Sequence, residues 1–441
     1  MRDRTVLLGI VITLGMIVWL SETFTRGYTL FIGLFGCVAA YCVYLIASQI
    51  RFRKRPRPEA PDFRPYVSVI IPAKNEESVI AATVENVLAM EYSLEDKTPH
   101  YELLVVNDGS TDSTGAILDA LAERYPGRLF IYHRQGGYHS KAAVLNEAQA
   151  RTHGEIIFVL DADAKVKKDF LSSALPYLAD TRVGAMQTAK HILNFEENWL
   201  TRAQEDELTT DRAIQKGRDA VDGAVELRGS GMLLKRTAIE DVGGWTESAL
   251  TEDVDMSAKL CVHGWEIRFA HDVPIWEEAI LSWGPLIRQR RRWAEGGLRK
   301  HIDYFYATGL PLSLNKKMDI LVFFSEFALP IWMLLDILYQ GLEIAAGRPF
   351  HLSVFMSVVC GLIGILVVNI TGGFASEFGF KPGKILRHTG RTLIYMLHWI
   401  PVILWTTVKI LVKSRPGQWK KTEHHGQQAS QISLPEAAEA K

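Results

Sequence analysis

The chain has few cysteines and almost no net charge. Its 441 residues include 4 cysteines, and its acidic and basic side chains nearly balance at a formal net charge of −1. The cysteines form no CxxC pair, so neither a disulfide framework nor a cysteine-held metal is expected. The balanced charge gives no general attraction to nucleic acid, and zinc-finger and RNA-binding motifs are missing. No nucleic-acid partner is therefore predicted.

The chain also lacks the glycine-rich fingerprint of dinucleotide-binding oxidoreductases. From Tyr66 onward short apolar runs alternate with helical patterns, which is typical of βαβ units around a largely parallel sheet. The first predicted strand, Val67–Ile71, is followed by Pro72–Glu76, which contains no glycine and therefore no GxGxxG. The missing motif excludes the usual NAD-binding site. The alternating pattern still predicts an α/β architecture.

Carboxylates follow three of the predicted strands. Ile156–Leu160 is a strand of apolar residues that leads into Asp161 and Asp163, while Glu76 and Asp108 follow the first and second strands. The carboxyl ends of parallel strands meet at one edge of a sheet, which is where such proteins bind ligands. Two carboxylates separated by one small residue suit Mg²⁺ or Mn²⁺ bound to a substrate diphosphate. The simpler alternatives are solvated loop aspartates and, for Asp108, an Asx-turn.

A second acidic motif opens a predicted helix. Thr251 is a good N-cap, so Glu252 and Asp253 would not be needed to cap the helix and could take part in binding or catalysis. A carboxylate there could take the proton from an attacking hydroxyl group, although an acidic residue at a helix start is often only a cap. Upstream, Gly229 and Gly231 indicate either close approach of the backbone to a ligand or an ordinary turn.

A basic motif closes the soluble part of the chain. Arginine occupies four of the five positions 288–292, together with Gln289, and Trp293 follows. Guanidinium groups match the oxygens of a diphosphate, and the tryptophan offers a flat face to a sugar ring or a lipid glycerol. The alternative is a basic amphipathic helix that lies on anionic lipid.

Long apolar runs flank this soluble part. Val6–Leu20 and Tyr28–Ser48 predict a membrane hairpin in residues 1–50, and a signal peptide is the alternative for the first run. The basic, proline-rich segment 51–65 is read as a cytoplasmic linker. Residues 66–300 are then the catalytic domain, which faces the cytoplasm.

Three more apolar runs follow the basic motif. They cover Ile320–Leu342, Leu352–Phe374 and Leu393–Val412, so residues 301–412 are read as an interfacial helix and membrane helices. Five spans would place the C-terminal tail outside the cell, whereas the lysines and arginine of residues 409–421 favour the cytoplasm. The number of spans stays open, and the tail 413–441 is read as cytoplasmic or disordered.

The ordered set of motifs resembles the membrane glycosyltransferases of family 2, a group that includes cellulose, chitin and hyaluronan synthases and several glycolipid synthases. The resemblance runs from about Val67 to Gly297. It rests on an aspartate after the second strand, an Asp-x-Asp, a Thr-Glu-Asp and a Gln-x-x-Arg-Trp. The matching residues here are Asp108, Asp161, Asp163, Thr251, Glu252, Asp253, Gln289, Arg292 and Trp293.

The resemblance implies a fold, a donor and roles for these residues. It implies a GT-A fold, a UDP-sugar donor, Mg²⁺ or Mn²⁺ at Asp161 and Asp163, and Asp253 as the general base that inverts the anomeric carbon. Further implied contacts to the nucleotide sugar come from Glu76, Asp108, Lys141, Asp161, Gln289 and Arg292, and contacts to the acceptor from Glu252 and Trp293.

Within the family the resemblance is to glucolipid synthases, which transfer glucose from UDP-glucose to diacylglycerol. A lipid acceptor needs only lateral access beside the active site, and the few apolar runs favour this over export of a polymer. The alternatives are a processive polysaccharide synthase and, in another class, a non-catalytic nucleotide-sugar sensor that regulates a partner.

Overall fold

The computed structural model divides the chain into two compact units, which are described separately. It describes residues 2–23, 27–52, 57–93, 98–136, 140–304, 309–348 and 352–412. The sheet unit comprises Arg55–Leu208 and Val225–Leu286, and the helical unit comprises Met1–Lys54, Thr209–Ala224 and Ile287–Gly417. Residues 287–300, which the sequence analysis places in the catalytic domain, fall in the helical unit. The tail 413–441 lies outside the described residues.

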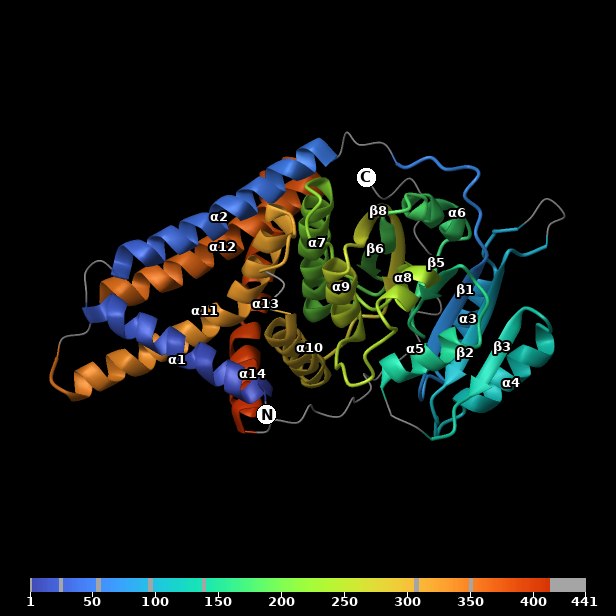
Figure 1. The fold of residues 1–441 in the computed structure, drawn as a ribbon, viewed down its shortest axis with the longest axis horizontal. Coiled ribbons are helices and arrows are strands. Elements are labelled where there is room, and N and C mark those ends of the chain that lie inside the picture. Colours follow the sequence, from blue (N-terminus) through green and yellow to red (C-terminus); the bar gives the residue numbers. More distant parts are fainter. Residues whose placement is uncertain are drawn as a thin grey trace. The chain divides into compact units, whose positions relative to one another are not determined.

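The sheet unit is built on one mixed, mostly parallel sheet. The strand order is β3-β2-β1-β4-β7-β6-β8-β5 (Figure 1). The strands β1 to β4 run parallel, β7 runs antiparallel to β4 and β6, and β5 runs antiparallel to β8. The strands are β1 Val67–Ala73, β2 Tyr101–Asn107, β3 Leu129–His133, β4 Ile156–Val159, β5 Lys165–Val166, β6 Val183–Ile192, β7 Met232–Lys235 and β8 Glu266–Glu277. The predicted α/β fold with a largely parallel sheet is confirmed.

Helices connect these strands at the positions that the sequence periodicity predicts. They are α3 Ile80–Leu88, α4 Thr114–Arg124, α5 Lys141–Gln149, α6 Phe170–Ala174, η1 Leu175–Leu178, α8 Arg236–Asp241, α9 Glu252–Val262 and the first part of α7 Trp199–Ala220. Between β5 and β6 a short α-helix is followed directly by a 3₁₀ turn. Pro176 has no N–H to continue the α-helical ladder, which explains the change.

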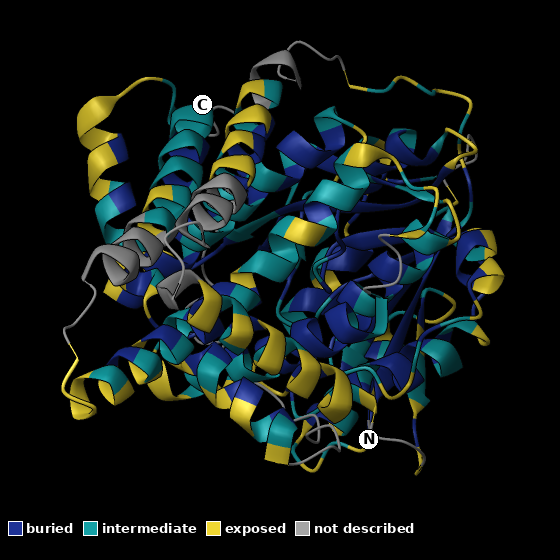
Figure 2. Ribbon diagram, turned by 60° about the vertical axis from the view of Figure 1, so that its left-hand side comes forward, coloured by how far each residue is buried: buried dark blue, intermediate teal, exposed yellow. Residues whose placement is uncertain are grey.

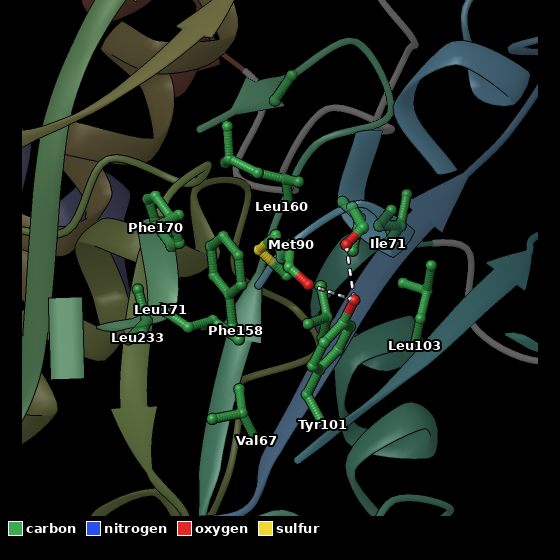
Figure 3. Packing of buried hydrophobic residues seen from close by; sticks show 14 of the residues in the cluster. Val67, Ile71, Met90, Tyr101, Leu103, Phe158, Leu160, Phe170, Leu171 and Leu233 are labelled. Atoms are coloured by element: carbon green, nitrogen blue, oxygen red, sulfur yellow. Dashed lines mark hydrogen bonds between the residues drawn. The ribbon is translucent and has the colours of Figure 1, made fainter. Parts of the chain in front are cut away.

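Both faces of the sheet are covered by buried apolar side chains. Alternate residues of a strand point to opposite faces, so Val69 and Ile71 pack with α3 while Ile70 packs with α5 on the other side. Nearly all residues of β1, β2, β4 and β7 are buried, the class drawn in dark blue in Figure 2. Figure 3 shows the first of these cores, in which Phe158 stacks on Phe170 with ring centroids 4.8 Å apart.

The topology brings distant segments to one edge of the sheet. The last residues of β1 and β2, Ala73 and Asn107, are aligned, and Ile70 is aligned with Val159 near the end of β4. The strand β6 points the same way as β4 because both are antiparallel to β7, and β8 is parallel to β6. The segments that follow β1, β2, β4, β6 and β8 therefore all emerge at this edge, which we call the rim.

The helical unit contains the apolar runs of the sequence. Its helices are α1 Arg2–Thr23, α2 Gly27–Phe52, the second part of α7, α10 Trp283–Tyr304 from Ile287 onward, α11 Leu314–Ala345, α12 Leu352–Phe378, α13 Pro382–Met396 and α14 Trp399–Val412. Among the described residues, three helical segments are long and apolar enough to cross a membrane, namely Arg2–Leu20, Leu314–Ala345 and Pro382–Val412. The apolar segments found within α2 and α12 are shorter.

One sequence prediction about these runs changes in the structure. The run Leu393–Val412 is not one helix, because α13 ends at Met396 and α14 begins at Trp399 with Pro401 in its first turn. Proline fits there because the first N–H groups of a helix have no partner within the helix. At the N-terminus, Leu7 packs with residues of α10 and α14, and Leu14 packs with residues of α11. The choice between a membrane hairpin and a signal peptide stays a prediction.

The Phe158–Phe170 pair generates a stability prediction. Phe158→Ala should destabilise the protein by about 3–5 kcal/mol, because the fully buried ring leaves a cavity. We expect the apparent Tm of the detergent-purified protein to fall by roughly 10 °C. Phe130→Ala is the matched control, since that ring is 46% exposed, and it should change the Tm little. Equal shifts for both variants would contradict the packing described.

Candidate active site

Asp161 and Asp163 lie at the rim directly after β4. The backbone N–H of Asp161 donates a hydrogen bond to Ser230 Oγ over 3.1 Å, and Asp163 Oδ2 accepts one from the backbone N–H of Glu278 over 3.2 Å. Each aspartate is therefore positioned by another segment that emerges at the rim. Both side chains remain partly exposed, so a ligand can reach them.

Lys141 links the first aspartate to the acidic helix start. Its Nζ lies 2.6 Å from Asp161 Oδ1 and 3.2 Å from Glu252 Oε1. It is the first residue of α5, whose N-cap Ser140 accepts a hydrogen bond from Ala143 N–H. Burial alone would lower the pKa of Lys141, but the two carboxylates outweigh it and the pKa is raised, so the ammonium group stays charged.

Asp253 is held beside this cluster in an environment that opposes its ionisation. Burial, together with the neighbouring Glu252, raises the pKa of Asp253 to about 6, although Lys141 opposes the shift. The backbone N–H of Val254 donates to Asp253 Oδ1 over 2.8 Å. A carboxylate with a pKa near neutrality can both accept and release a proton under ordinary conditions.

The glycine segment Glu226–Gly231 passes between the aspartates. Gly229 has φ +81°, and a Cβ built on it would stand 3.3 Å from Asp253 Oδ2. Gly231 has φ +75°, and a Cβ there would clash with Thr188 Oγ1. The segment therefore requires glycine both for its backbone conformation and for space. The positive φ values also fit an ordinary turn, so close approach of the backbone to a ligand stays a prediction.

A second ion pair at the rim was not predicted from the sequence. Lys190 at the end of β6 lies 2.9 Å from Glu277 Oε2 at the end of β8, and its Nζ also donates to the backbone carbonyl of Arg228 over 3.0 Å. Arg228 in turn pairs with Glu226 over 2.9 Å. The sequence does contain one signal for this site, because Lys190 lies near the end of a mostly apolar strand. The ends of such strands also carry Asp161 and Asp163.

Glu76 and Asp108 lie on adjacent loops farther along the rim. The loops are joined by hydrogen bonds, including Glu76 N–H to Thr114 Oγ1 over 2.7 Å. Asp108 is 7% exposed and accepts a hydrogen bond from Arg134 Nη1 over 2.7 Å, with Lys74 Nζ at 3.4 Å. Asp108 is thus paired with cations, and Arg134 is a rim residue that the sequence analysis missed. The Asx-turn alternative does not describe this pairing.

The carboxylates at the rim could bind a divalent cation that is also coordinated by a substrate diphosphate. Among the described residues, His, Cys, Asp and Glu form no group of three or more that could hold a metal ion by themselves. Mg²⁺ typically takes one or two protein carboxylates and completes its shell with phosphate oxygens and water. The Asp161 and Asp163 pair fits this pattern, so a cation there would share its ligands with a diphosphate.

Comparisons with known proteins agree with this arrangement. Residues 64–296 match the family described as "Glycosyltransferase like family 2". The chain is 33% identical over 365 residues to the beta-monoglucosyldiacylglycerol synthase of Synechocystis sp., which covers 82% of this chain and 75% of the relative. The chain belongs to glycosyltransferase family 2. The predicted family and enzyme class are therefore confirmed.

Two further comparisons concern the product and the fold. The glycosyltransferase is 24% identical to the poly-beta-1,6-N-acetyl-D-glucosamine synthase of Staphylococcus epidermidis, over 77% of this chain and 80% of that one. It also shares the fold of the mannosyltransferase PcManGT from Pyrobaculum calidifontis, solved with GDP-Man and Mn²⁺. That match has a TM-score of 0.55 at 20% identity and covers 86% of this chain and 98% of the other. The predicted GT-A fold is confirmed.

The remaining predicted residues of the glycosyltransferase lie on α10 in the helical unit. Gln289 accepts a hydrogen bond from Arg290 Nη1 over 2.7 Å, and Arg292 and Trp293 follow. Arg290 is itself buried, with its guanidinium group 4.0 Å from the centre of the Trp293 ring and bonded to Tyr395. Arg290 thus packs within the helical unit, and contact of Gln289 and Arg292 with a nucleotide sugar stays a prediction.

One local prediction at the acidic helix is wrong. Thr251 occupies the N-cap position of α9, but its side chain accepts no capping hydrogen bond. The carboxylates of the first turn, Glu252 and Asp253, face the positive end of the helix dipole, which compensates for the missing cap. The conclusion that both carboxylates are available for other contacts is unaffected.

The glycine segment generates a prediction about turnover. Gly229→Ala should cost roughly 1 kcal/mol of stability through its positive φ and should lower kcat about tenfold, because a methyl group would crowd Asp253. Gly127→Ala is the matched control, since Gly127 has φ +75° with nothing within 4 Å. We expect the control to lose similar stability and keep its kcat. A normal kcat in Gly229→Ala would contradict the crowding described.

Proposed function

We propose that the enzyme transfers glucose from UDP-glucose to 1,2-diacylglycerol with inversion at the anomeric carbon, forming beta-monoglucosyldiacylglycerol. The observation that carries this proposal is the short ionic chain Asp161–Lys141–Glu252, with Asp253 beside it. It supports placing a donor-binding carboxylate and a candidate base at one site. The choice of glucose and diacylglycerol rests on the similarity to the synthase from Synechocystis sp..

The donor end of the site is assigned to the carboxylates of the rim. We propose that Asp161 and Asp163 hold Mg²⁺ or Mn²⁺ with the donor diphosphate, where the cation would neutralise charge on the leaving group. The Mn²⁺ and GDP-Man bound to PcManGT support this choice. Glu76 and Asp108 are proposed to contact the nucleoside, with Asp108 held in place by Arg134. Lys141, Gln289 and Arg292 are proposed to contact the nucleotide sugar.

The acceptor end of the site is assigned to the start of α9. We propose that Asp253 takes the proton of the acceptor hydroxyl, whose oxygen then attacks the anomeric carbon opposite the diphosphate. The C–O bond to the diphosphate breaks as the new glycosidic bond forms, and the leaving UDP carries away the electron pair. This single displacement inverts the anomeric centre. Glu252 and Trp293 are proposed to position the acceptor.

The proposed location is a membrane, with the active site on the cytoplasmic side. The three long apolar helical segments support membrane insertion, and the basic segment near Arg57 supports a cytoplasmic catalytic domain. Diacylglycerol dissolves in the bilayer, so an active site at the membrane surface would receive it laterally. No channel through the bilayer is required for this reaction.

The product of the reaction tests the proposal. Purified enzyme is incubated with radiolabelled UDP-glucose, Mg²⁺ and diacylglycerol in mixed micelles. We expect label in one chloroform-soluble lipid whose anomeric proton shows the large coupling constant of a β-linkage. UDP-galactose and GDP-mannose serve as donor controls and should give little product. An α-linked lipid would contradict the proposed inversion.

The alternative is a processive polysaccharide synthase, and the similarity to the Staphylococcus epidermidis enzyme favours it. The same assay separates the two functions when UDP-N-acetylglucosamine is added as a third donor. Label in insoluble material that a glycoside hydrolase releases would reject the glucolipid proposal in favour of polymer synthesis.

The proposed base generates a prediction about pH. Only the carboxylate form of Asp253 can accept a proton, and its pKa is raised to about 6. The kcat should therefore fall about tenfold per pH unit below pH 6 and level off above it. Asp253→Asn should lower kcat at least about 1,000-fold at every pH. Asp119→Asn, an exposed carboxylate of the same unit, is the control and should leave the profile unchanged. A profile without an acidic limb would contradict the assignment.

The proposed cation generates a separate prediction. Chelation should abolish transfer, and Mg²⁺ or Mn²⁺ should restore it. Asp163→Asn removes one of two carboxylate ligands and should raise the half-saturating cation concentration at least about tenfold. Asp169→Asn, an exposed aspartate at the start of α6, should not change it. Full activity in the presence of chelator would contradict the cation site.

A further inference from the structure

Lys190 holds three segments of the rim together. It stands near the end of β6, pairs with Glu277 over 2.9 Å and donates to the backbone carbonyl of Arg228 over 3.0 Å. Only 12% of its side-chain surface is exposed. None of the motifs that define the proposed donor, acceptor or cation site contains it.

The Glu277 contact leads to the proposed cation site. Glu277 is followed by Glu278, whose backbone N–H donates to Asp163 Oδ2 over 3.2 Å. The chain continues to Ala279, whose N–H is bonded to Asn194 beyond the end of β6. Lys190 therefore joins β6 to the segment that positions Asp163.

The Arg228 contact leads to the proposed base. Two residues beyond Arg228, Ser230 Oγ accepts the backbone N–H of Asp161 over 3.1 Å. Between them, the Cα of Gly229 faces Asp253 Oδ2. The peptide that Lys190 holds is therefore the one that touches both Asp161 and Asp253.

We propose that Lys190 is a positioning residue that fixes the distance between the cation site and the base by bridging Glu277 and the Arg228 carbonyl. The inference rests on the proposed function, because it assigns a role relative to those two groups. An ammonium group brings three donors and a charge, so Lys190 can donate to the Arg228 carbonyl and also neutralise Glu277, which a neutral side chain could not do. Bond formation needs near-attack geometry, and a displacement of about 1 Å can cost about 100-fold in rate.

The charges around Asp253 give this bridge a second, measurable consequence. Glu252 repels the ionised form of Asp253, while Lys141 and Arg228 favour it. Lys190 also interacts electrostatically with Asp161 and Asp253. Removing the Lys190 cation should therefore raise the pKa of Asp253 and move the acidic limb of the kcat profile to higher pH.

Three variants distinguish the positioning role of the Lys190 bridge from the electrostatic effect of its charge. We expect Lys190→Met to lower kcat about 100-fold, with less than a threefold change in donor KM, and to shift the acidic limb upward. Lys190→Arg keeps the cation and should recover at least tenfold of the lost kcat. The double variant Lys190→Met, Glu277→Gln leaves no unpaired charge, so it should fold, regain the pH profile and keep the low kcat.

Lys235→Met is the matched control. Lys235 lies on β7 and donates its Nζ to the Asp180 carbonyl over 2.7 Å, outside the rim. It should leave kcat and the pH profile unchanged.

Hydrogen exchange of residues 226–231 and 278–280 supplies a readout that does not require transfer. It should accelerate at least about tenfold in Lys190→Met and in the double variant, and not in Lys235→Met. Failure of wild-type enzyme to glucosylate diacylglycerol would count against the proposed function alone. The proposed positioning role of Lys190 is contradicted if the exchange rates of the double variant equal those of the wild type. It is also contradicted if the kcat of the double variant lies within threefold of the wild-type kcat.

Discussion

One buried ammonium group, that of Lys141, holds the candidate active site together. It contacts Asp161 after β4 and Glu252 at the start of α9, two segments that are about ninety positions apart in the sequence. Without a cation between them, these carboxylates would repel one another in surroundings that screen charge poorly. Only 14% of the Lys141 side chain and 7% of the Glu252 side chain are exposed, so losing either partner would leave a poorly solvated charge.

The sheet supplies the rigid frame on which these charges are placed. Its apolar strands are covered on both faces, and the charged groups of the site lie at strand ends, at helix starts and in the loops between them. Two lysines, Lys141 and Lys190, each bridge acceptors from different segments. This pattern separates the tasks, because strand packing provides stability while the strand ends, helix starts and loops provide chemistry. A site assembled from several segments keeps a precise geometry only if contacts such as the Lys141 and Lys190 ion pairs hold those segments together.

The helical unit uses buried charges in a similar way. Asp319 of α11 contacts Arg218 of α7 over 3.3 Å, the backbone N–H of Ala224 over 2.8 Å and the hydroxyl of Tyr41 over 3.0 Å. Glu295 of α10 pairs with both Arg299 and Lys409. Such ion pairs are costly to bury unless every partner is present, so they specify which helices pack together.

The sequence by itself determined the elements and the family. Alternation of short apolar runs with helical patterns gave the strands, because each strand of a covered parallel sheet must be apolar along its length. The motifs around Asp108, Asp161, Asp253 and Trp293 indicated the family because their order along the chain is constrained. The local capping rule failed at Thr251, whose side chain makes no capping hydrogen bond. The carboxylates of Glu252 and Asp253 stabilise the helix start instead.

Only the tertiary structure decided which charges meet. Lys190 and Arg134 pair with Glu277 and Asp108, which lie on other parts of the chain, so no short motif marks these contacts. The raised pKa of Asp253 likewise depends mainly on its burial, which the sequence does not show, although the adjacent Glu252 adds to the shift. Periodicity records how each segment buries its own apolar face, whereas electrostatic pairing depends on distances across the sheet. Those distances exist only after the chain has folded.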